Sequence, residues 1–265
     1  MSGIRIAVAG KGGAGKTTLS ATLSRLLARA GHHVLVIDAD SNPNVAVALG
    51  IERDRAAAIP MLPHTLVSRR LDGPRLLEPV AGIGERHGAV GPDGVAVVHM
   101  AMPAHADEGC LCSAHATVSA ILADSAPAIG DGNGIGPSQI TLVDLEASPE
   151  HFGRGTTRHV DVLFLVVEPY YRSLETARRM SGLAAELPIG HVGVVGNKLR
   201  SESDGDAIEA FCERHGLPLD GSLPWSTQVL DADKAGIPLL DFDVDDPVVH
   251  AVSSLASMVQ AARPT

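Results

Sequence analysis

A glycine-rich stretch near the start of the chain has the residue types and spacing of a phosphate-binding loop. Residues 10–17 read GKGGAGKT, which matches the pattern G-x-x-x-x-G-K-[ST] with Gly10, Gly15, Lys16 and Thr17 at its fixed positions. Glycines let backbone N–H groups close around phosphate oxygens, the lysine neutralises the β and γ oxygens, and the threonine hydroxyl ligates Mg²⁺. The pattern therefore predicts a site for a nucleotide with Mg²⁺.

A pair of cysteines is the second candidate for chemistry. Cys110 and Cys112 are separated by one residue in a polar stretch, and Cys212 is the only other cysteine. A disulfide within the pair would close a small strained ring, which a reducing compartment disfavours. Two buried structural thiols are an alternative that the polar neighbours do not favour. Two thiolates are half of a tetrahedral zinc site, and four could hold a metal ion or an iron–sulfur cluster.

The periodicity of apolar residues predicts the elements that would position these groups. Strands are expected at 4–10, 33–38, 94–100, 139–144, 161–167, 191–197 and 219–224, and helices at 16–31, 113–125, 171–187, 204–216 and 246–262. This alternation predicts an α/β fold with a mostly parallel twisted sheet of about seven or eight strands and helices on both faces. Residues 125–139 have the composition of a surface loop. Because we find no repeat and no clean linker, we expect one domain over 1–265.

Composition and charge disfavour several classes of partner. The 265 residues are 45% hydrophobic and 20% charged, which is ordinary for a globular protein. The formal net charge of −10 argues against nucleic acid as a partner. The most apolar run is too short to cross a membrane, and the first residues do not resemble a signal peptide. We therefore expect a cytoplasmic protein with reduced thiols and no membrane partner.

The phosphate loop carries a second lysine, Lys11, directly after its first glycine. The form KGGAGKTT resembles the deviant Walker A loop of the ATPase class that includes the nitrogenase iron protein, MinD and ParA. The resemblance implies that ATP/ADP and Mg²⁺ are bound by Gly10, Lys11, Gly12, Gly13, Ala14, Gly15, Lys16, Thr17 and Thr18. It also implies a nucleotide-dependent homodimer, in which Lys11 reaches the nucleotide of the partner subunit.

Three later stretches match the same class in the expected order. Asp40, in VIDADSNPN, matches the acid that positions the attacking water, and Asp38 ends the preceding strand close to the metal. Asp144, in TLVDLEASPEHF, matches the Walker B acid that holds Mg²⁺ through its water shell. The resemblance implies that Lys11, Lys16 and Asp40 are catalytic. It places Asn197, Lys198 and Pro224 around the adenine.

A two-fold dimer would also complete the cysteine site. An isologous interface places a residue opposite its symmetry mate, so two copies of Cys110 and Cys112 would supply four sulfurs. Thiolates suit Ni²⁺, Zn²⁺ or Cu(I), so these residues alone do not name the metal. His99, His105 and His115 flank the pair and are weaker candidate ligands, because histidine is common in polar loops.

The cysteine pair also narrows the resemblance to one branch of the class. The segments KGG-GKTT, DAD, GCLCS, EHFGRGT…VDVLFLVVEP and NK resemble the CooC family over roughly residues 4–240. These ATPases help mature the nickel–iron–sulfur carbon monoxide dehydrogenase, and Cys-x-Cys and RGT (154–156) are the discriminating motifs. The resemblance implies that ATP closes the dimer and assembles a Ni²⁺ or Zn²⁺ site from Cys110 and Cys112. Hydrolysis at Asp40 would release the metal to a client metalloenzyme such as carbon monoxide dehydrogenase.

Two other functions remain open from the sequence. An ATP-gated iron–sulfur reductase resembling the nitrogenase iron protein needs a cluster, although DLEASPEHFGRG lacks that family's second cysteine. A switch ATPase resembling MinD or ParA is disfavoured, because the end of the chain is not a basic amphipathic helix. Cys212 has helical spacing with Ile208 and Phe211, which predicts a core thiol. Residues 51–93 match nothing we recognise.

Overall fold

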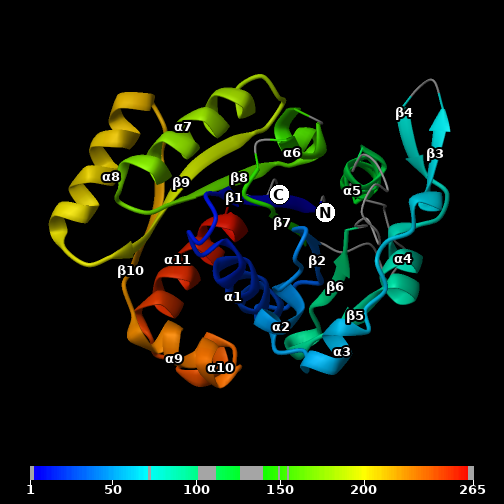
Figure 1. The fold of residues 1–265 in the computed structure, drawn as a ribbon, viewed down its shortest axis with the longest axis horizontal. Helices are drawn as coiled ribbons and strands as arrows, with labels where there is room; N and C mark the ends of the chain where they lie inside the picture. Colours follow the sequence, from blue (N-terminus) through cyan, green and yellow to red (C-terminus); the bar gives the residue numbers. More distant parts are fainter. Residues whose placement is uncertain are drawn as a thin grey trace.

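The strands form two sheets within the described part of the chain, which is residues 3–70, 73–100, 112–125, 140–148, 150–153 and 155–261. In this computed structural model the main sheet contains β1 (Ile4–Gly10), β2 (Val34–Ala39), β5 (Gly88–Val90), β6 (Ala96–His99), β7 (Ile140–Leu145), β8 (Val162–Val167), β9 (His191–Leu199) and β10 (Leu219–Pro224). The spatial order is β10-β9-β8-β1-β7-β2-β6-β5 (Figure 1), and only β5 runs antiparallel to its neighbour. β3 (Val67–Arg70) and β4 (Gly73–Leu76) form a separate antiparallel pair.

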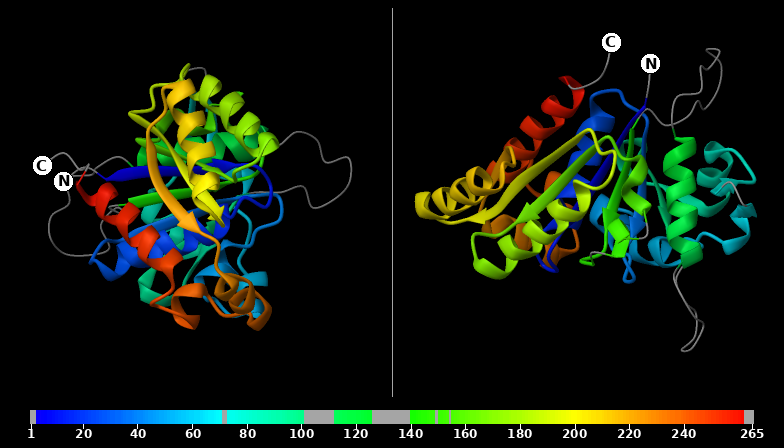
Figure 2. Two further views of the ribbon diagram at one scale, coloured as in Figure 1. Left: turned by 90° about the vertical axis from the view of Figure 1, so that its left-hand side faces the viewer. Right: turned by 90° about the horizontal axis from the view of Figure 1, so that it is seen from above.

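Helices lie on both faces of the twisted main sheet (Figures 1 and 2). The α-helices are α1 (Lys16–Arg29), α2 (Val45–Leu49), α3 (Arg53–Ala57), α4 (Val80–His87), α5 (Cys112–Asp124), α6 (Glu150–Gly153), α7 (Tyr171–Ala184), α8 (Glu202–His215), α9 (Thr227–Ala235), α10 (Leu239–Phe242) and α11 (Pro247–Ala261). Three 3₁₀ turns are η1 (His64–Leu66), η2 (Pro92–Gly94) and η3 (Thr156–His159). Figure 1 shows α1 and α11 on one side of the sheet and α7 and α8 on the other.

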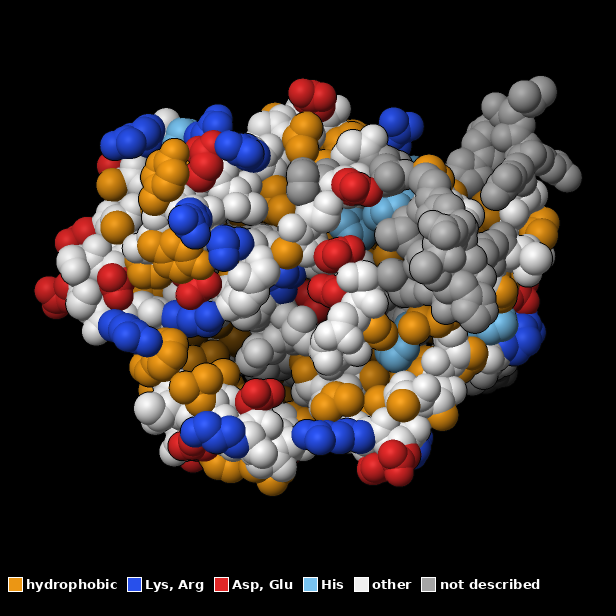
Figure 3. Space-filling view, viewed as in Figure 1, with side chains coloured by type: hydrophobic (Ala, Val, Ile, Leu, Met, Phe, Trp, Pro, Cys, Tyr) orange, Lys and Arg blue, Asp and Glu red, His pale blue; other side chains and the backbone are white. Residues whose placement is uncertain are grey.

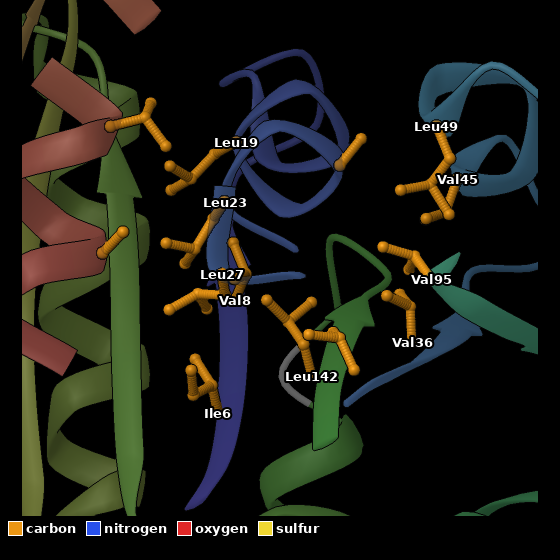
Figure 4. Close-up of a cluster of buried hydrophobic side chains, with 14 of the residues drawn as sticks. Ile6, Val8, Leu19, Leu23, Leu27, Val36, Val45, Leu49, Val95 and Leu142 are labelled. Atoms are coloured by element: carbon orange, nitrogen blue, oxygen red, sulfur yellow. The ribbon is translucent and has the colours of Figure 1, made fainter. Parts of the chain in front are cut away.

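The core follows from the alternation of side chains along each strand. In β1, Ile6 and Val8 pack with α1 and α11, whereas Ala7 and Ala9 face the cluster that contains α5, α7 and α8. Every side chain from Ile6 to Ala9 is therefore buried, which explains why the strand reads as a continuous apolar run. Figure 4 shows the first cluster, in which leucines of α1 meet β1, β2 and β7. This packing fixes α1 against the strand that precedes it.

The predicted fold class is confirmed, and the differences lie in the irregular segments. Residues 51–93, which the sequence left unassigned, contain α3, the β3–β4 pair, α4 and the edge strand β5. These elements are short and their apolar residues show only weak periodicity, so no sequence pattern predicted them. The segment after the predicted strand 219–224 contains α9, which the sequence analysis did not predict. Nearly all of the predicted surface loop, 126–139, lies outside the described residues. Within the described part, no helix is both long enough and apolar enough to span a membrane.

A buried arginine ties α1 to two distant segments. Arg25, of which only 3% is exposed, donates from Nε to Asp93 at 2.6 Å and from Nη2 to Asp241 at 2.8 Å. Asp93 lies in η2 with a left-handed backbone (φ 58°), and Asp241 lies in α10. Arg29, one turn further along α1, approaches the same two carboxylates at 3.1 and 3.6 Å but is 38% exposed. The C-terminal half of α1 is thus clamped by charge as well as by packing.

We predict that Arg25→Met lowers the free energy of unfolding by about 2–3 kcal/mol, because it removes the buried cation from two carboxylates and leaves them only the more exposed Arg29. The solvent exposure of the two aspartates keeps the loss below that of a fully buried pair. Arg29→Met is the matched control and should cost less than about 1 kcal/mol, as exposed pairs do. Urea unfolding measures both, and equal losses would contradict the assigned role of Arg25.

Candidate functional site

The loop between β1 and α1 has the backbone of an anion cradle. Gly15 lies in the left-handed region (φ 97°) directly before α1, and a Cβ there would collide with the side-chain amide of Asn197. Gly10 (φ 149°) lies against the carbonyl of Val166, where a Cβ has no room either. Both positions therefore require glycine. The free N–H groups at the start of α1 and the positive end of its dipole favour a phosphate at this loop.

Lys16 is the first residue of α1, and its side chain folds back over the loop. It is buried, and its Nζ lies 3.5 Å from the carbonyl oxygen of Lys11. Burial lowers the pKa of Lys16, while the carboxylates of Asp144, Asp40 and Glu146 act in the opposite direction. Phosphate oxygens would supply the further negative charge that a buried ammonium group needs.

Asp144, near the end of β7, is held by two hydroxyls of α1. Thr17 Oγ1 donates to Asp144 Oδ2 at 2.7 Å, and Ser20 Oγ donates to Asp144 Oδ1 at 2.9 Å. Burial raises the pKa of Asp144 to about 6, although these two hydroxyls and Lys16 act to lower it. Ser20 was missed by the sequence analysis. The sequence feature that could have pointed to Ser20 is a polar residue one turn after Lys16, on the buried face of the helix.

Asp38 lies beside Asp144 because β2 and β7 pair in parallel with these two residues in register. Burial raises the pKa of Asp38 to about 7, and the neighbouring Asp144 adds to the rise. Backbone N–H donors of Val45 (2.8 Å) and Asp40 (3.2 Å) oppose it. Asp40 itself is partly exposed in the turn after β2, where its Oδ1 accepts from the N–H of Asn42 at 2.9 Å.

The donor set at these strand ends fits Mg²⁺. It consists of oxygen ligands, namely the hydroxyl of Thr17 and the carboxylate of Asp144, with the carboxylate of Asp38 next to them. Magnesium prefers such hard oxygen donors and usually keeps several waters. Burial raises the pKa of both carboxylates, so a bound cation would stabilise their ionised forms.

A pocket of about 330 Å³ opens beside the phosphate loop, and the residues expected around the adenine lie in its wall. Its wall includes Gly15, Thr18, Asn197, Lys198, Pro224 and Trp225 with apolar side chains of α9 and α11. A hollow lined largely by hydrophobic side chains is visible on the corresponding face of the molecule (Figure 3). The predicted base residues are therefore brought together with the predicted phosphate residues.

Residues near the carboxyl end of β9 also hold the phosphate loop in place. Asn197 Nδ2 donates to the carbonyl of Ala14 at 2.7 Å, and Lys198 Nζ donates to the carbonyl of Gly13 at 2.5 Å. Lys198 has a left-handed backbone (φ 63°) and also pairs with Glu168 at 3.2 Å. These contacts were not anticipated. They give Asn197 and Lys198 a role in shaping the loop besides their place at the pocket wall.

Trp225, the only tryptophan of the chain, is a second residue that the sequence analysis missed. It follows Pro224, lines the base pocket, and stacks against Arg200, whose guanidinium carbon lies 4.0 Å from the ring centroid. A lone tryptophan next to a predicted base-covering segment was the available signal. Its fluorescence provides a native probe of the pocket.

Lys11 lies at the rim of the loop. Its Nζ is 5.7 Å from the ring centroid of Tyr170, within the range of a cation–π contact. A groove of about 440 Å³ begins here and runs along α7, past Tyr171, which is 79% exposed, and Arg179.

The cysteine pair is only partly described. Cys110 and His105 lie outside the described residues, whereas Cys112 is the exposed first residue of α5. Cys212 is a free, buried thiol, as its helical spacing predicts, and burial raises its pKa to about 11.

The histidines near the cysteine pair do not form a metal centre on their own. His99 and His115 are buried, and burial lowers the pKa of His99. Among the described residues, no group of three or more His, Cys, Asp or Glu side chains is arranged to hold a metal ion. A site that includes Cys112 would therefore need ligands from outside this part of the chain, from the rest of the loop or from another subunit.

Comparison with known proteins agrees with this geometry. The chain is 34% identical over 272 residues to the carbon monoxide dehydrogenase accessory protein CooC of Rhodospirillum rubrum, covering 99% of this chain and 98% of that one. It is 30% identical over 249 residues to an uncharacterized ATP-binding protein of Methanocaldococcus jannaschii, covering 89% and 91% of the two chains. The MinD cell division protein of Aquifex aeolicus has a similar fold, with a TM-score of 0.70, 22% identity and 99% coverage of both chains.

The family described as the CobQ/CobB/MinD/ParA nucleotide binding domain matches residues 6–239, which is most of the chain. The match includes the phosphate loop, both strand-end aspartates and the segment after β9. Together with the buried lysine, the paired carboxylates and the base pocket, this match assigns the chain to the CobQ/CobB/MinD/ParA family, of which it is an ATPase.

Proposed function

We propose that the chain is an ATP-dependent metallochaperone that delivers a metal ion to a client metalloenzyme. The observation that carries the proposal is the position of Cys112 at the start of α5, a helix packed against the segment that follows Asp144. The helix that carries Cys112 is thereby connected to the nucleotide site through the segment that runs from Asp144 to Thr156. The relative named as a carbon monoxide dehydrogenase accessory protein supports carbon monoxide dehydrogenase as the client.

Each half of the nucleotide site has a proposed role. Lys16 and the N–H groups of residues 10–18 hold the phosphates, and Asn197, Lys198 and Pro224 border the base. Thr17 and Asp144 would hold Mg²⁺, which neutralises phosphate charge when bound. Asp40, in the exposed turn after β2, orients the attacking water.

The cargo site requires two subunits in this proposal. Lys11 lies at the rim of the loop, where it can leave Tyr170 and reach a nucleotide across a two-fold axis. Cys110 and Cys112 of each subunit, once reduced, supply four thiolates, a ligand set that suits Zn²⁺ and Ni²⁺ as cargo. ATP binding favours the closed dimer and so raises metal affinity, and hydrolysis lowers it.

The nucleotide assignment is tested by Lys16→Ala. We expect ATP hydrolysis to fall by about 100-fold or more, because a positive charge aimed at the reacting phosphate is lost. Lys234→Ala is the matched control, since Lys234 is exposed and pairs only with Asp231 among the residues that the structure describes. Phosphate release measures both variants. Unchanged turnover in Lys16→Ala would contradict the phosphate-loop assignment.

The raised pKa of Asp144 predicts a pH-dependent affinity for Mg²⁺–ADP. With a pKa of about 6, the carboxyl is mostly protonated at pH 5 and mostly ionised at pH 7, and Mg²⁺ favours the ionised form. Affinity should therefore rise by about tenfold over this range. Titration followed by Trp225 fluorescence measures it. Asp144→Asn should reduce this rise, and the part that remains reports neighbouring groups such as Asp38, whose pKa of about 7 lies in the same range. An unchanged rise in that variant would show that Asp144 is not responsible.

The cargo site is tested by elemental analysis and solution mass of the reduced, anaerobic protein supplied with Ni²⁺ or Zn²⁺, with and without ATP. We expect one metal ion per dimer, lost in Cys110→Ser/Cys112→Ser and retained in the control Cys212→Ala. Retention of metal by the double variant would place the site elsewhere. Iron with sulfide would favour the iron–sulfur reductase, and absence of metal in both states would favour a switch ATPase.

A further inference from the structure

α5 is attached to the segment after Asp144 by contacts on one of its faces. His115 Nδ1 and Thr156 Oγ1 share a hydrogen bond of 3.0 Å, and the rings of His115 and His151 meet edge-to-face with centroids 4.6 Å apart. One turn further, Ser119 Oγ donates to the carbonyl of Gly155 at 3.5 Å. Positions 112, 115 and 119 lie on the same side of a helix, so this face begins with Cys112. Figure 1 shows α5 next to α6, which carries His151.

The contact between these elements is buried and polar. His115, His151 and Thr156 are at most 3% exposed, and apolar residues such as Val118 and Phe152 pack around them. A hydrogen bond between buried groups is specific, because moving either partner leaves the other without water to replace it. α5 and η3 therefore shift together or lose this bond.

The other end of the same segment lies at the nucleotide site. Asp144 accepts hydrogen bonds from Thr17 and Ser20, and the next acidic residue, Glu146, accepts from Ser41 Oγ at 3.1 Å in the turn after β2. A change at the γ-phosphate acts on both turns. Only five residues separate Asp144 from the start of α6, so little slack is available to absorb a displacement.

We propose that the hydrogen bond between His115 and Thr156, supported by His151, couples the state of the nucleotide to the position of Cys112. His115 and Thr156 are positioning residues, since neither lies at the nucleotide. The consequence for metal affinity rests on the metallochaperone function proposed above. The coupling itself is a property of the ATPase and is measurable without metal.

Thr156→Val tests the coupling, because it removes the hydroxyl and keeps the shape of the side chain. Thr156→Ser is the matched control that retains the hydroxyl. His115→Phe/Thr156→Val replaces both partners with apolar groups, which avoids an unpaired buried nitrogen and keeps a ring against His151. The readout is amide hydrogen exchange of residues 112–124 in nucleotide-free protein and with a saturating, non-hydrolysable ATP analogue and Mg²⁺, with Trp225 fluorescence confirming saturation.

We expect exchange in α5 to change by about fivefold or more with nucleotide in the unmodified chain and in Thr156→Ser. In Thr156→Val and in the double variant the change should fall below about twofold. An equal response in Thr156→Val, or no response of α5 in the unmodified chain, would overturn the proposal.

The dissociation constant of Ni²⁺, measured with and without the analogue, separates this proposal from the function on which it rests. A ratio of about five or more that falls toward one in Thr156→Val supports both. If α5 responds to nucleotide in the unmodified chain but not in Thr156→Val, and no Ni²⁺ binds, the cargo function fails and the coupling holds. If Thr156→Val keeps the full ratio, the coupling fails and the cargo function holds.

Discussion

The site depends on burying two carboxylates side by side. Asp38 and Asp144 end neighbouring parallel strands in register, and burial raises the pKa of both toward neutrality. Such a pair is stable only with compensating donors or positive charge. The hydroxyls of Thr17 and Ser20, the backbone N–H groups after β2 and the ammonium group of Lys16 each provide part of that compensation. A cation bound with the nucleotide would provide the rest. Two buried carboxylates side by side thus favour ligands that bring positive charge.

The fold could be predicted from local pattern and strand order, whereas the nucleotide-site residues were predicted from the phosphate-loop pattern and a resemblance to a known ATPase class. Continuous apolar strands imply helices on both faces, and the carboxyl ends of parallel strands share one edge. Asp38, Asp144 and Asn197 could therefore be placed near the phosphate loop without coordinates. Other contacts could not be predicted, because they depend on which helix face or backbone turn meets the loop. They are those of Ser20 with Asp144, of Trp225 with Arg200, and of Lys198 with the carbonyl of Gly13. The cluster of His115, His151 and Thr156 joins elements 36 to 41 residues apart, beyond any local pattern.

Residues 51–93 are a stretch in which the sequence predicted no elements although the structure contains several. Their elements are three to eight residues long. β5 lies at the edge of the sheet, where it pairs with one neighbouring strand. Short edge elements are specified by tertiary contacts more than by propensity. The exposed position of Cys112, by contrast, agrees with its polar neighbours in the sequence, and α5 begins only one residue before the predicted helix 113–125.

The clamp around Arg25 has a consequence for how the molecule moves. It fastens one end of α1 to η2 and α10, while the leucines of α1 fasten its length to the sheet. The phosphate loop, at the opposite end, is braced by Asn197 and Lys198. α1 is therefore held at both ends and along its length, so a bound phosphate would contact a helix that is fixed relative to the sheet. Because both ends of this helix are held, we expect movement on phosphate binding in the turns after β2 and β7, which meet through the hydrogen bond from Ser41 to Glu146.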